Sequence, residues 1–435
     1  MMNNKILSLI VISLLTINFS YSFQTSKAKK FAKSITEKEL SEHLYIYASD
    51  EFEGRDTGEP GQKKAVEYLR NYYKSIGIEP GDLEGDYFQE MTLTMRGRRG
   101  QEPRTVETEN VVAIIKGSEK PDEYVVITAH LDHVGVDDKG IYNGADDDGS
   151  GTVALLEIAE AFKKAADKGK GPKRSIVFLH VTGEEKGLLG SAYYADNPIY
   201  PLENTVVNLN VDMIGRIDPS RREKNRDYIY LIGSDHDSVD LHNLSEQTNA
   251  ESVNMTLDYR FNDKNDPNRF YYRSDHYNFA KNGIPIIFYF TGTHADYHKV
   301  TDTPDKIEYD LLETRSRLIF YTAWNIANRE KRLVVDPKPE KVAFEISRDD
   351  LKKFHGIYAS ELMPLKFEVY TKSAKLAMNP IGMDQELVLE ATSKNTFKQE
   401  IAGIEVTFEE GTMKLKMQGR EISFKIVPPE TDKEE

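Results

Sequence analysis

Histidine and carboxylate side chains that could bind a metal ion recur through the middle of the chain. Imidazole and carboxylate donors without sulfur suit zinc and, less selectively, manganese or cobalt. Two histidines and three carboxylates are too many for one tetrahedral zinc ion, but they can hold two zinc ions if one carboxylate bridges them. Two such ions can polarise a carbonyl group and supply hydroxide at neutral pH. The candidate metal ligands, in chain order, are His130, Asp147, Glu185, Asp212 and His298.

Three consecutive aspartates, Asp146 to Asp148, precede an apolar stretch that favours a buried helix. Two carboxylates ~4 Å apart repel each other by about 4 kcal/mol at an effective dielectric of ~20, so such a cluster requires a cation, a proton or open water. A solvated turn that caps the helix is the alternative, because aspartate and glycine are common there. A calcium loop of the EF-hand type is excluded, because alignment on Asp148 and Gly149 leaves Gly144 and Leu155 at ligand positions.

Short apolar runs alternate with helical stretches through the region that carries these residues. This pattern predicts an α/β domain with a mainly parallel mixed sheet and helices on both faces. Three of the predicted strands, YVVITA, SIVFLHV and NLNV, are each followed by candidate ligands. Ligands of open α/β sheets bind beyond the carboxyl ends of the strands, so we expect these side chains to meet at one edge. Helices are expected over residues 36–48, 152–166, 238–248 and 309–328.

Composition excludes several classes of protein. The chain has 435 residues and no cysteine, which rules out disulfides, thiolate metal ligands and a cysteine nucleophile. Its formal net charge of −15 argues against nucleic acid as a partner, because phosphate binding requires clustered lysine and arginine. An acidic surface does suit cations and amines.

Residues 1–22 have the pattern of a signal peptide. Lys5 precedes an apolar run from Ile6 to Phe19, and small residues follow at Ser20 and Ser22. The run is shorter than the ~20 residues that a membrane span requires. We therefore expect cleavage after Ser22, an exported chain in the periplasm or outside the cell, and no membrane span in the mature protein.

A change of composition near residue 334 predicts two domains. The stretch VVDPKPEKVAF is rich in proline and lysine, and short alternating strands follow it. These strands predict a small all-β barrel or sandwich. The expected organisation is a signal peptide (1–22), a catalytic domain (28–333), a linker (334–344), an all-β domain (345–428) and a disordered acidic tail (429–435).

Five motifs in order, AHLDHVG, NGADDDGSG, TGEEKGLLGS, NLNVDMIG and YHKVTDTPDK, resemble those of the co-catalytic dizinc aminopeptidase family. This family includes bacterial leucyl aminopeptidases and glutamate carboxypeptidase, and the similarity runs from about Ser49 to Asn328. The resemblance implies the zinc exopeptidase fold, with two zinc ions per chain. The all-β segment weakly resembles lipocalin-like modules appended to bacterial hydrolases.

The resemblance also implies roles for the candidate residues. His130 and Asp212 would hold one zinc ion, Glu185 and His298 the other, and Asp147 would bridge them through a turn whose Asp147–Asp148 peptide bond is cis. The two flanking aspartates would point to the backbone or to water. The remaining roles are Glu184 as general base, Asp132 as the carboxylate that hydrogen-bonds the far nitrogen of His130, and Tyr297 as a donor to the tetrahedral oxyanion.

Several nearby residues are not expected to be ligands. His133 and His294 lie close to His130 and His298 in sequence, but HKVTDT matches the family spacing at His298. His180 lies within an apolar strand and is expected to be a hydrogen-bonded core histidine. Residues 274–276 resemble a wall of the substrate pocket, although a helix N-cap explains them equally well.

The function expected from these residues is that of an exported zinc-dependent aminopeptidase acting on peptides with a free N-terminus. Carboxypeptidases and single-zinc glutaminyl cyclases use the same scaffold and remain alternatives. A non-enzymatic binding protein is a further alternative, which predicts broken ligands, yet all five ligands and the base are present.

Overall fold

The computed structural model describes residues 25–82, 85–95, 103–221, 225–338, 344–383, 386–417 and 420–428. The expected signal peptide and acidic tail lie outside these residues. The chain divides into two compact units, of which the first comprises Met1–Met95, Thr105–Asp263 and Arg273–Pro337 and the second Arg96–Arg104, Lys264–Tyr272 and Lys338–Glu435. Within the described ranges, no helix is both long enough and apolar enough to cross a membrane.

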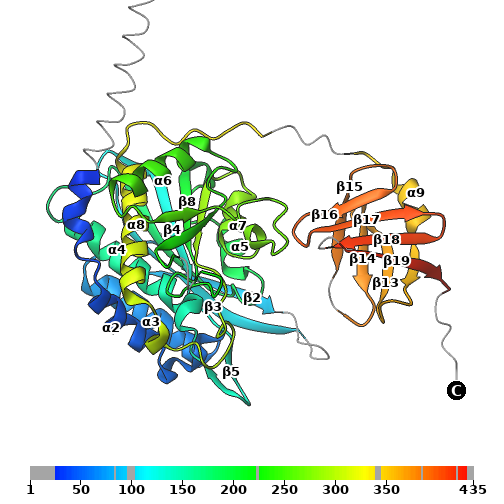
Figure 1. Ribbon diagram of the computed structural model, residues 1–435, viewed down its shortest axis with the longest axis horizontal. Coiled ribbons are helices and arrows are strands. Elements are labelled where there is room, and N and C mark those ends of the chain that lie inside the picture. Colours follow the sequence, from blue (N-terminus) through cyan, green and yellow to red (C-terminus); the bar gives the residue numbers. More distant parts are fainter. Residues whose placement is uncertain are drawn as a thin grey trace, which may run out of the picture. The chain divides into compact units, whose positions relative to one another are not determined.

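The first unit is built around a mixed sheet whose central strands are parallel (Figure 1). The order is β1-β3-β7-β4-β8-β11-β9-β10, with β2 paired to β3. Strands β7, β4, β8 and β11 are parallel neighbours. Strand β3 runs antiparallel to β1 and β7, and β9 runs antiparallel to β11 but parallel to β10. The bounds are β1 Glu79–Pro80, β2 Phe88–Met95, β3 Arg104–Ile115, β4 Lys120–His130, β7 Arg174–Val181, β8 Thr205–Val211, β9 Tyr228–Ile232, β10 Thr256–Asp258 and β11 Ile286–Phe290. The expected fold class is confirmed.

Helices cover both faces of this sheet because its central strands are apolar on both sides. Helices α4 and α8 pack on one face against β4 and β7, and α7 packs on the other against β8 and β11. The bounds are α2 Glu37–Tyr47, α3 Pro60–Ser75, α4 Gly151–Ala166, α5 Leu189–Asp196, α6 Val239–Glu251, α7 His276–Ala280 and α8 Tyr309–Asn328. Thr36 caps α2 and Ser238 caps α6 through their side-chain oxygens, as favoured at helix starts.

Short elements carry the loops around the carboxyl ends of the strands. A two-stranded ribbon of β5 (Gly135–Asp137) and β6 (Gly140–Tyr142) follows β4, and the three aspartates lie in η2 (Ala145–Ser150). The other short turns are η1 Asp50–Arg55, η3 Leu202–Asn204, η4 Phe270–Tyr272 and η5 Pro304–Lys306.

The second unit contains a closed barrel of eight antiparallel strands. Alternate residues of each strand point inward, and the interior is filled by side chains such as Phe367, Met378, Phe397, Val406 and Phe424. The elements are α9 Arg348–Leu351, η6 Lys352–Phe354, β12 Gly356–Ala359, β13 Lys366–Lys372, β14 Lys375–Pro380, β15 Leu387–Ala391, β16 Thr396–Gln399, β17 Ile404–Glu409, β18 Thr412–Met417 and β19 Arg420–Val427.

Candidate metal centre and active site

All five candidate ligands meet at the carboxyl ends of the central strands. His130 is the last residue of β4, and Asp212 directly follows β8. Glu185 lies in the loop after β7, Asp147 lies in η2, and His298 lies in the segment after β11. The sheet therefore gathers donors that are far apart in the sequence, at the edge where open α/β sheets bind ligands.

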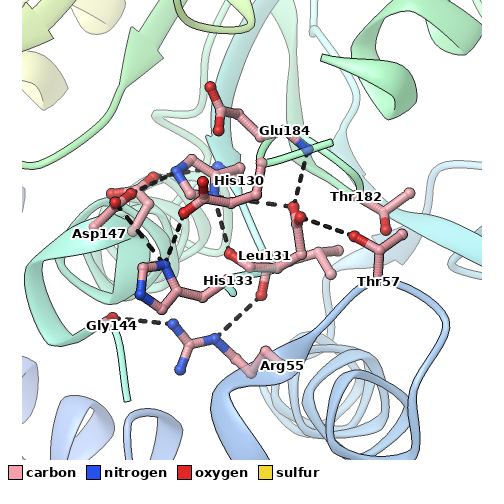
Figure 2. Close-up of polar contacts among 12 residues, drawn as sticks. Arg55, Thr57, His130, Leu131, His133, Gly144, Asp147, Thr182 and Glu184 are labelled. Carbon is pink, nitrogen blue, oxygen red and sulfur yellow. Dashed lines mark hydrogen bonds and ion pairs between the residues drawn. The ribbon is translucent and has the colours of Figure 1, made fainter. Parts of the chain in front are cut away.

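Asp147 lies between two groups of donors. Its Oδ1 is 3.1 Å from Nε2 of His130, which Figure 2 shows beside it, and its Oδ2 is 3.0 Å from Nε2 of His298. Asp212 Oδ1 is 3.8 Å from His130 Nε2, and Glu185 Oε1 is 3.1 Å from His298 Nε2. One carboxylate thus connects a His130 group to a His298 group, as a ligand shared by two ions must.

This donor set fits zinc because it consists of imidazoles and carboxylates and because two of its buried carboxylate oxygens make no hydrogen bond among the described residues. These oxygens are Asp147 Oδ2 and Glu185 Oε1. Burial alone would lower the pKa of His130, but its contacts with Asp147 and Asp212 raise that pKa well above the usual range. Protonated imidazoles thus balance buried carboxylates in the metal-free chain, and a divalent cation would replace those protons.

The two outer aspartates of the turn hold the backbone. Asp148 Oδ1 accepts hydrogen bonds from the N–H groups of Gly151 (2.9 Å) and Met213 (3.1 Å), and its Oδ2 accepts one from His130 (3.2 Å). A carboxylate oxygen of Asp148 also lies within 4.8 Å of donor atoms of His130 and Asp212, but both of its oxygens already accept hydrogen bonds from these N–H groups. Asp146 accepts from Gly215 N–H at 2.6 Å. The expected cis peptide bond between Asp147 and Asp148 is confirmed.

The Glu184 carboxyl interacts electrostatically with His130, Glu185 and Asp212 and belongs to neither group of donors. Its backbone N–H donates to Oδ1 of Asp132 at 3.1 Å, which holds the loop after β7 (Figure 2). Burial raises the pKa of the Glu184 carboxyl well above its usual range, and the Glu185 and Asp212 carboxylates add to this against the lowering effect of His130. A carboxyl group with a raised pKa is suited to accept and return a proton near neutral pH.

Asp132 does not make the hydrogen bond expected of it. The far nitrogen of His130, Nδ1, is 3.0 Å from the backbone carbonyl of Asp132 and 3.9 Å from its carboxylate. The carboxylate is turned toward the hydroxyl of Thr57, which donates to Oδ2 at 2.9 Å, and toward the Glu184 N–H. The residue thus orients the histidine through its main chain and the loop of Glu184 through its side chain.

Tyr297 and Ser274 border the centre. The ring of Tyr297 stacks on that of His298 with centroids 3.9 Å apart, and burial raises the pKa of the Tyr297 phenol, so that the phenol keeps its proton. The Ser274 hydroxyl donates to Oδ2 of Asp212 at 2.6 Å. Asp275, the N-cap residue of α7, makes no side-chain cap.

Two residues at the centre were missed or discounted from the sequence. His133 is fully buried, and its Nδ1 lies 2.9 Å from Oε1 of Glu185.

Arg55 is also buried, and its guanidinium donates to the carbonyls of Leu131 (3.2 Å), Tyr47 (3.1 Å), Asn143 (2.8 Å) and Gly144 (2.9 Å). It joins the loop after β4 to the aspartate turn (Figure 2). The only sequence signal for Arg55 is its place in a glycine-rich loop, and that for His133 is its spacing from His130.

The other discounted histidines lie outside the donor groups. His180 Nε2 is 2.7 Å from the Tyr73 hydroxyl, and burial lowers the pKa of His180 to about 3, as expected for a neutral core histidine. His294 Nε2 lies 3.2 Å from Oδ2 of Asp146. His294 therefore supports the turn that carries Asp147.

Clustered imidazoles and carboxylates at the carboxyl edge of a mixed α/β sheet place the first unit in the class of zinc metallopeptidase domains. Residues 110–323 match the profile of Peptidase family M28.

A probable zinc metalloprotease of Pyrenophora teres f. teres is 28% identical over 269 residues, which are 52% of this chain and 53% of that protein. The chain thus spans about half the length of the curated relatives it matches. The LapA aminopeptidase of Legionella pneumophila shares the fold, with a TM-score of 0.53 and 20% identity over 70% of this chain and 75% of that one. The glutaminyl cyclase of Porphyromonas gingivalis does so with a TM-score of 0.51 and 18% identity over 66% of this chain and 97% of that one.

Proposed function

We propose that the chain is a two-zinc aminopeptidase that removes N-terminal residues from peptides. The observation that carries this proposal is the position of Asp147, whose two oxygens face two different histidines. His130 and Asp212 would hold one ion, and Glu185 and His298 the other, with Asp147 shared between them. The ions would supply Lewis acidity toward the scissile carbonyl and lower the pKa of a bound water.

Glu184 would act as general base and then as general acid. Its carboxylate would accept a proton from the water that attacks the scissile carbonyl, and the carboxylic acid so formed would return the proton to the leaving amine nitrogen. The backbone contact with Asp132 fixes the loop from which this carboxyl projects. Tyr297 keeps its phenolic proton and would donate it in a hydrogen bond to the oxygen on which negative charge develops.

Acidic surroundings favour a substrate with a free α-ammonium group. The whole chain carries a formal net charge of −15. Such a field attracts the cationic N-terminus of a peptide and repels its C-terminal carboxylate. This asymmetry supports an aminopeptidase over a carboxypeptidase.

Metal analysis of the purified chain, combined with a panel of aminoacyl, dipeptidyl and C-terminal substrates, tests the proposal. We expect two zinc ions per chain and hydrolysis of aminoacyl substrates. One zinc ion with cyclisation of N-terminal glutamine would establish a glutaminyl cyclase instead, and cleavage only at the C-terminus would establish a carboxypeptidase. A chain that binds no metal would be a binding protein.

A further inference from the structure

We propose that His133 is a fourth protein ligand of the zinc ion held by Glu185, His298 and Asp147. This inference rests on the proposed function, because it assigns one more residue to a centre that the function requires. It makes the two metal positions unequal, since the ion of His130 and Asp212 would keep only three protein ligands.

The distances around His133 suit a shared ion. His133 Nδ1 is 2.9 Å from Glu185 Oε1 and 3.9 Å from Asp147 Oδ2, the same two oxygens that lie 3.1 and 3.0 Å from His298 Nε2. Zinc bound at ~2.0–2.2 Å by four tetrahedral ligands places neighbouring donors roughly 3.3–3.6 Å apart. The four contacts scatter around that value. Figure 2 shows the His133 ring turned toward Asp147.

Hydrogen bonding does not account for this ring. Neither Nδ1 nor Nε2 of His133 makes a hydrogen bond among the described residues, although the side chain is fully buried. The atoms nearest to Nδ1 are oxygens of Glu185 and Asp147, which are themselves proposed zinc ligands, so the ring and these oxygens can bind the same ion. His180, which is equally buried, is satisfied by Tyr73.

The surrounding backbone holds the ring in this place. The N–H of His133 donates to the carbonyl of Arg55 at 3.2 Å, which fixes the main chain below the imidazole. Gly144 has a φ of 52°, and a Cβ there would lie 2.6 Å from the Cγ and Cδ2 atoms of His133. Only glycine therefore leaves room for the imidazole beside the turn that carries Asp147.

This assignment leaves the two ions with different numbers of open coordination positions. The ion of His133, Glu185, His298 and Asp147 would have a complete set of four protein ligands, as in structural zinc sites. The ion of His130, Asp212 and Asp147 would retain an open position, as in catalytic sites. Water and the substrate carbonyl would then bind chiefly at the His130 ion.

Zinc K-edge X-ray absorption on the full, zinc-loaded chain tests this assignment without a mutation. Its fine structure counts imidazole ligands, and we expect three imidazoles shared by two ions. Two imidazoles shared by two ions would overturn the assignment while leaving the proposed function intact. Failure of the wild-type chain to bind two ions would instead refute the proposed function on which the assignment depends.

His133→Gln provides the second measurement. We expect the affinity for one of the two ions to fall by more than ~100-fold, beyond the 10- to 100-fold typical of losing a hydrogen bond to a ligand, and the imidazole count to fall to two. His180→Gln is the matched control, since it removes a buried histidine remote from the centre and should leave both quantities unchanged. Retention of both ions with an unchanged imidazole count in His133→Gln would overturn the assignment.

Discussion

The neighbouring glutamates Glu184 and Glu185 are expected to respond in opposite ways to the same substitution. Glutamine keeps the size and polarity of either side chain but cannot take a proton from water. Glu185 Oε1 lies within 3.1 Å of both His133 and His298, so its loss removes an anionic donor. Glu184 is not a proposed metal ligand and would act only on the proton of the attacking water. Its replacement should therefore leave both ions in place.

The magnitudes follow from these positions. A lost general base lowers turnover by about 10²- to 10⁴-fold, which corresponds to roughly 2.7–5.5 kcal/mol of activation free energy. Because burial and neighbouring carboxylates disfavour a charged Glu184, the neutral amide should not lower the thermal stability of the metal-free chain. Glu185→Gln should weaken one metal site by at least ~100-fold, and excess zinc should partly restore turnover.

The assay is turnover of an aminoacyl substrate, measured beside zinc content per chain. Glu90→Gln, an exposed glutamate on β2, controls for the substitution itself and should change neither quantity. Metal loss in Glu184→Gln with retention in Glu185→Gln would reverse the two roles. Full activity in both variants would refute the two-zinc mechanism altogether.

A chain that ends after Pro337 should fold, bind zinc and hydrolyse small aminoacyl amides, because every proposed ligand lies in the first unit; loss of turnover with zinc retained would assign the barrel a part in the site. Arg55→Met removes the hydrogen-bond donors to four buried carbonyls. Each unmet carbonyl costs about 1–3 kcal/mol, so the melting temperature should fall steeply. A decrease in melting temperature of less than ~1 °C would show that these contacts contribute little to stability. Burial depresses the pKa of His180 to about 3, so the neutral His180 side chain contributes its full stabilisation above pH ~6.5, and this stabilisation is lost as the pH falls toward 3. In denaturant melts, His180→Gln should therefore lose less unfolding free energy on acidification than the wild-type chain. N-terminal sequencing of the protein from the culture medium or periplasm should begin after Ser22, and an intact cytoplasmic chain would contradict export.

Much of the fold could be predicted because its strands are continuous apolar runs that leave little choice of structure. The segments SIVFLHV and YVVITAH became β7 and β4, and the expected helix over residues 309–328 became α8. The short strands β1 and β10 could not be predicted, because two or three residues carry no periodicity.

The candidate ligands could be predicted because their chemistry is distinctive and strand ends converge. The supporting contacts could not, since they depend on which atoms the loops present after folding. The Asp132 carboxylate illustrates this point, as Thr57 lies 75 residues away in sequence and still decides where that carboxylate turns. Arg55 is similar, because its acceptors are carbonyl groups, which every residue possesses and no motif reveals.

The donors of each proposed ion come from the ends of different strands and from the segments that follow them, so metal binding is coupled to the stability of the fold. In the unfolded chain they are separated by long flexible segments, so no high-affinity chelating site exists before folding. Each bound ion would then act as a cross-link that closes long loops and shifts the folding equilibrium by mass action. Removal of zinc by a chelator should therefore loosen the connections between the strand ends first, and proteases should cut there while the strands themselves remain paired.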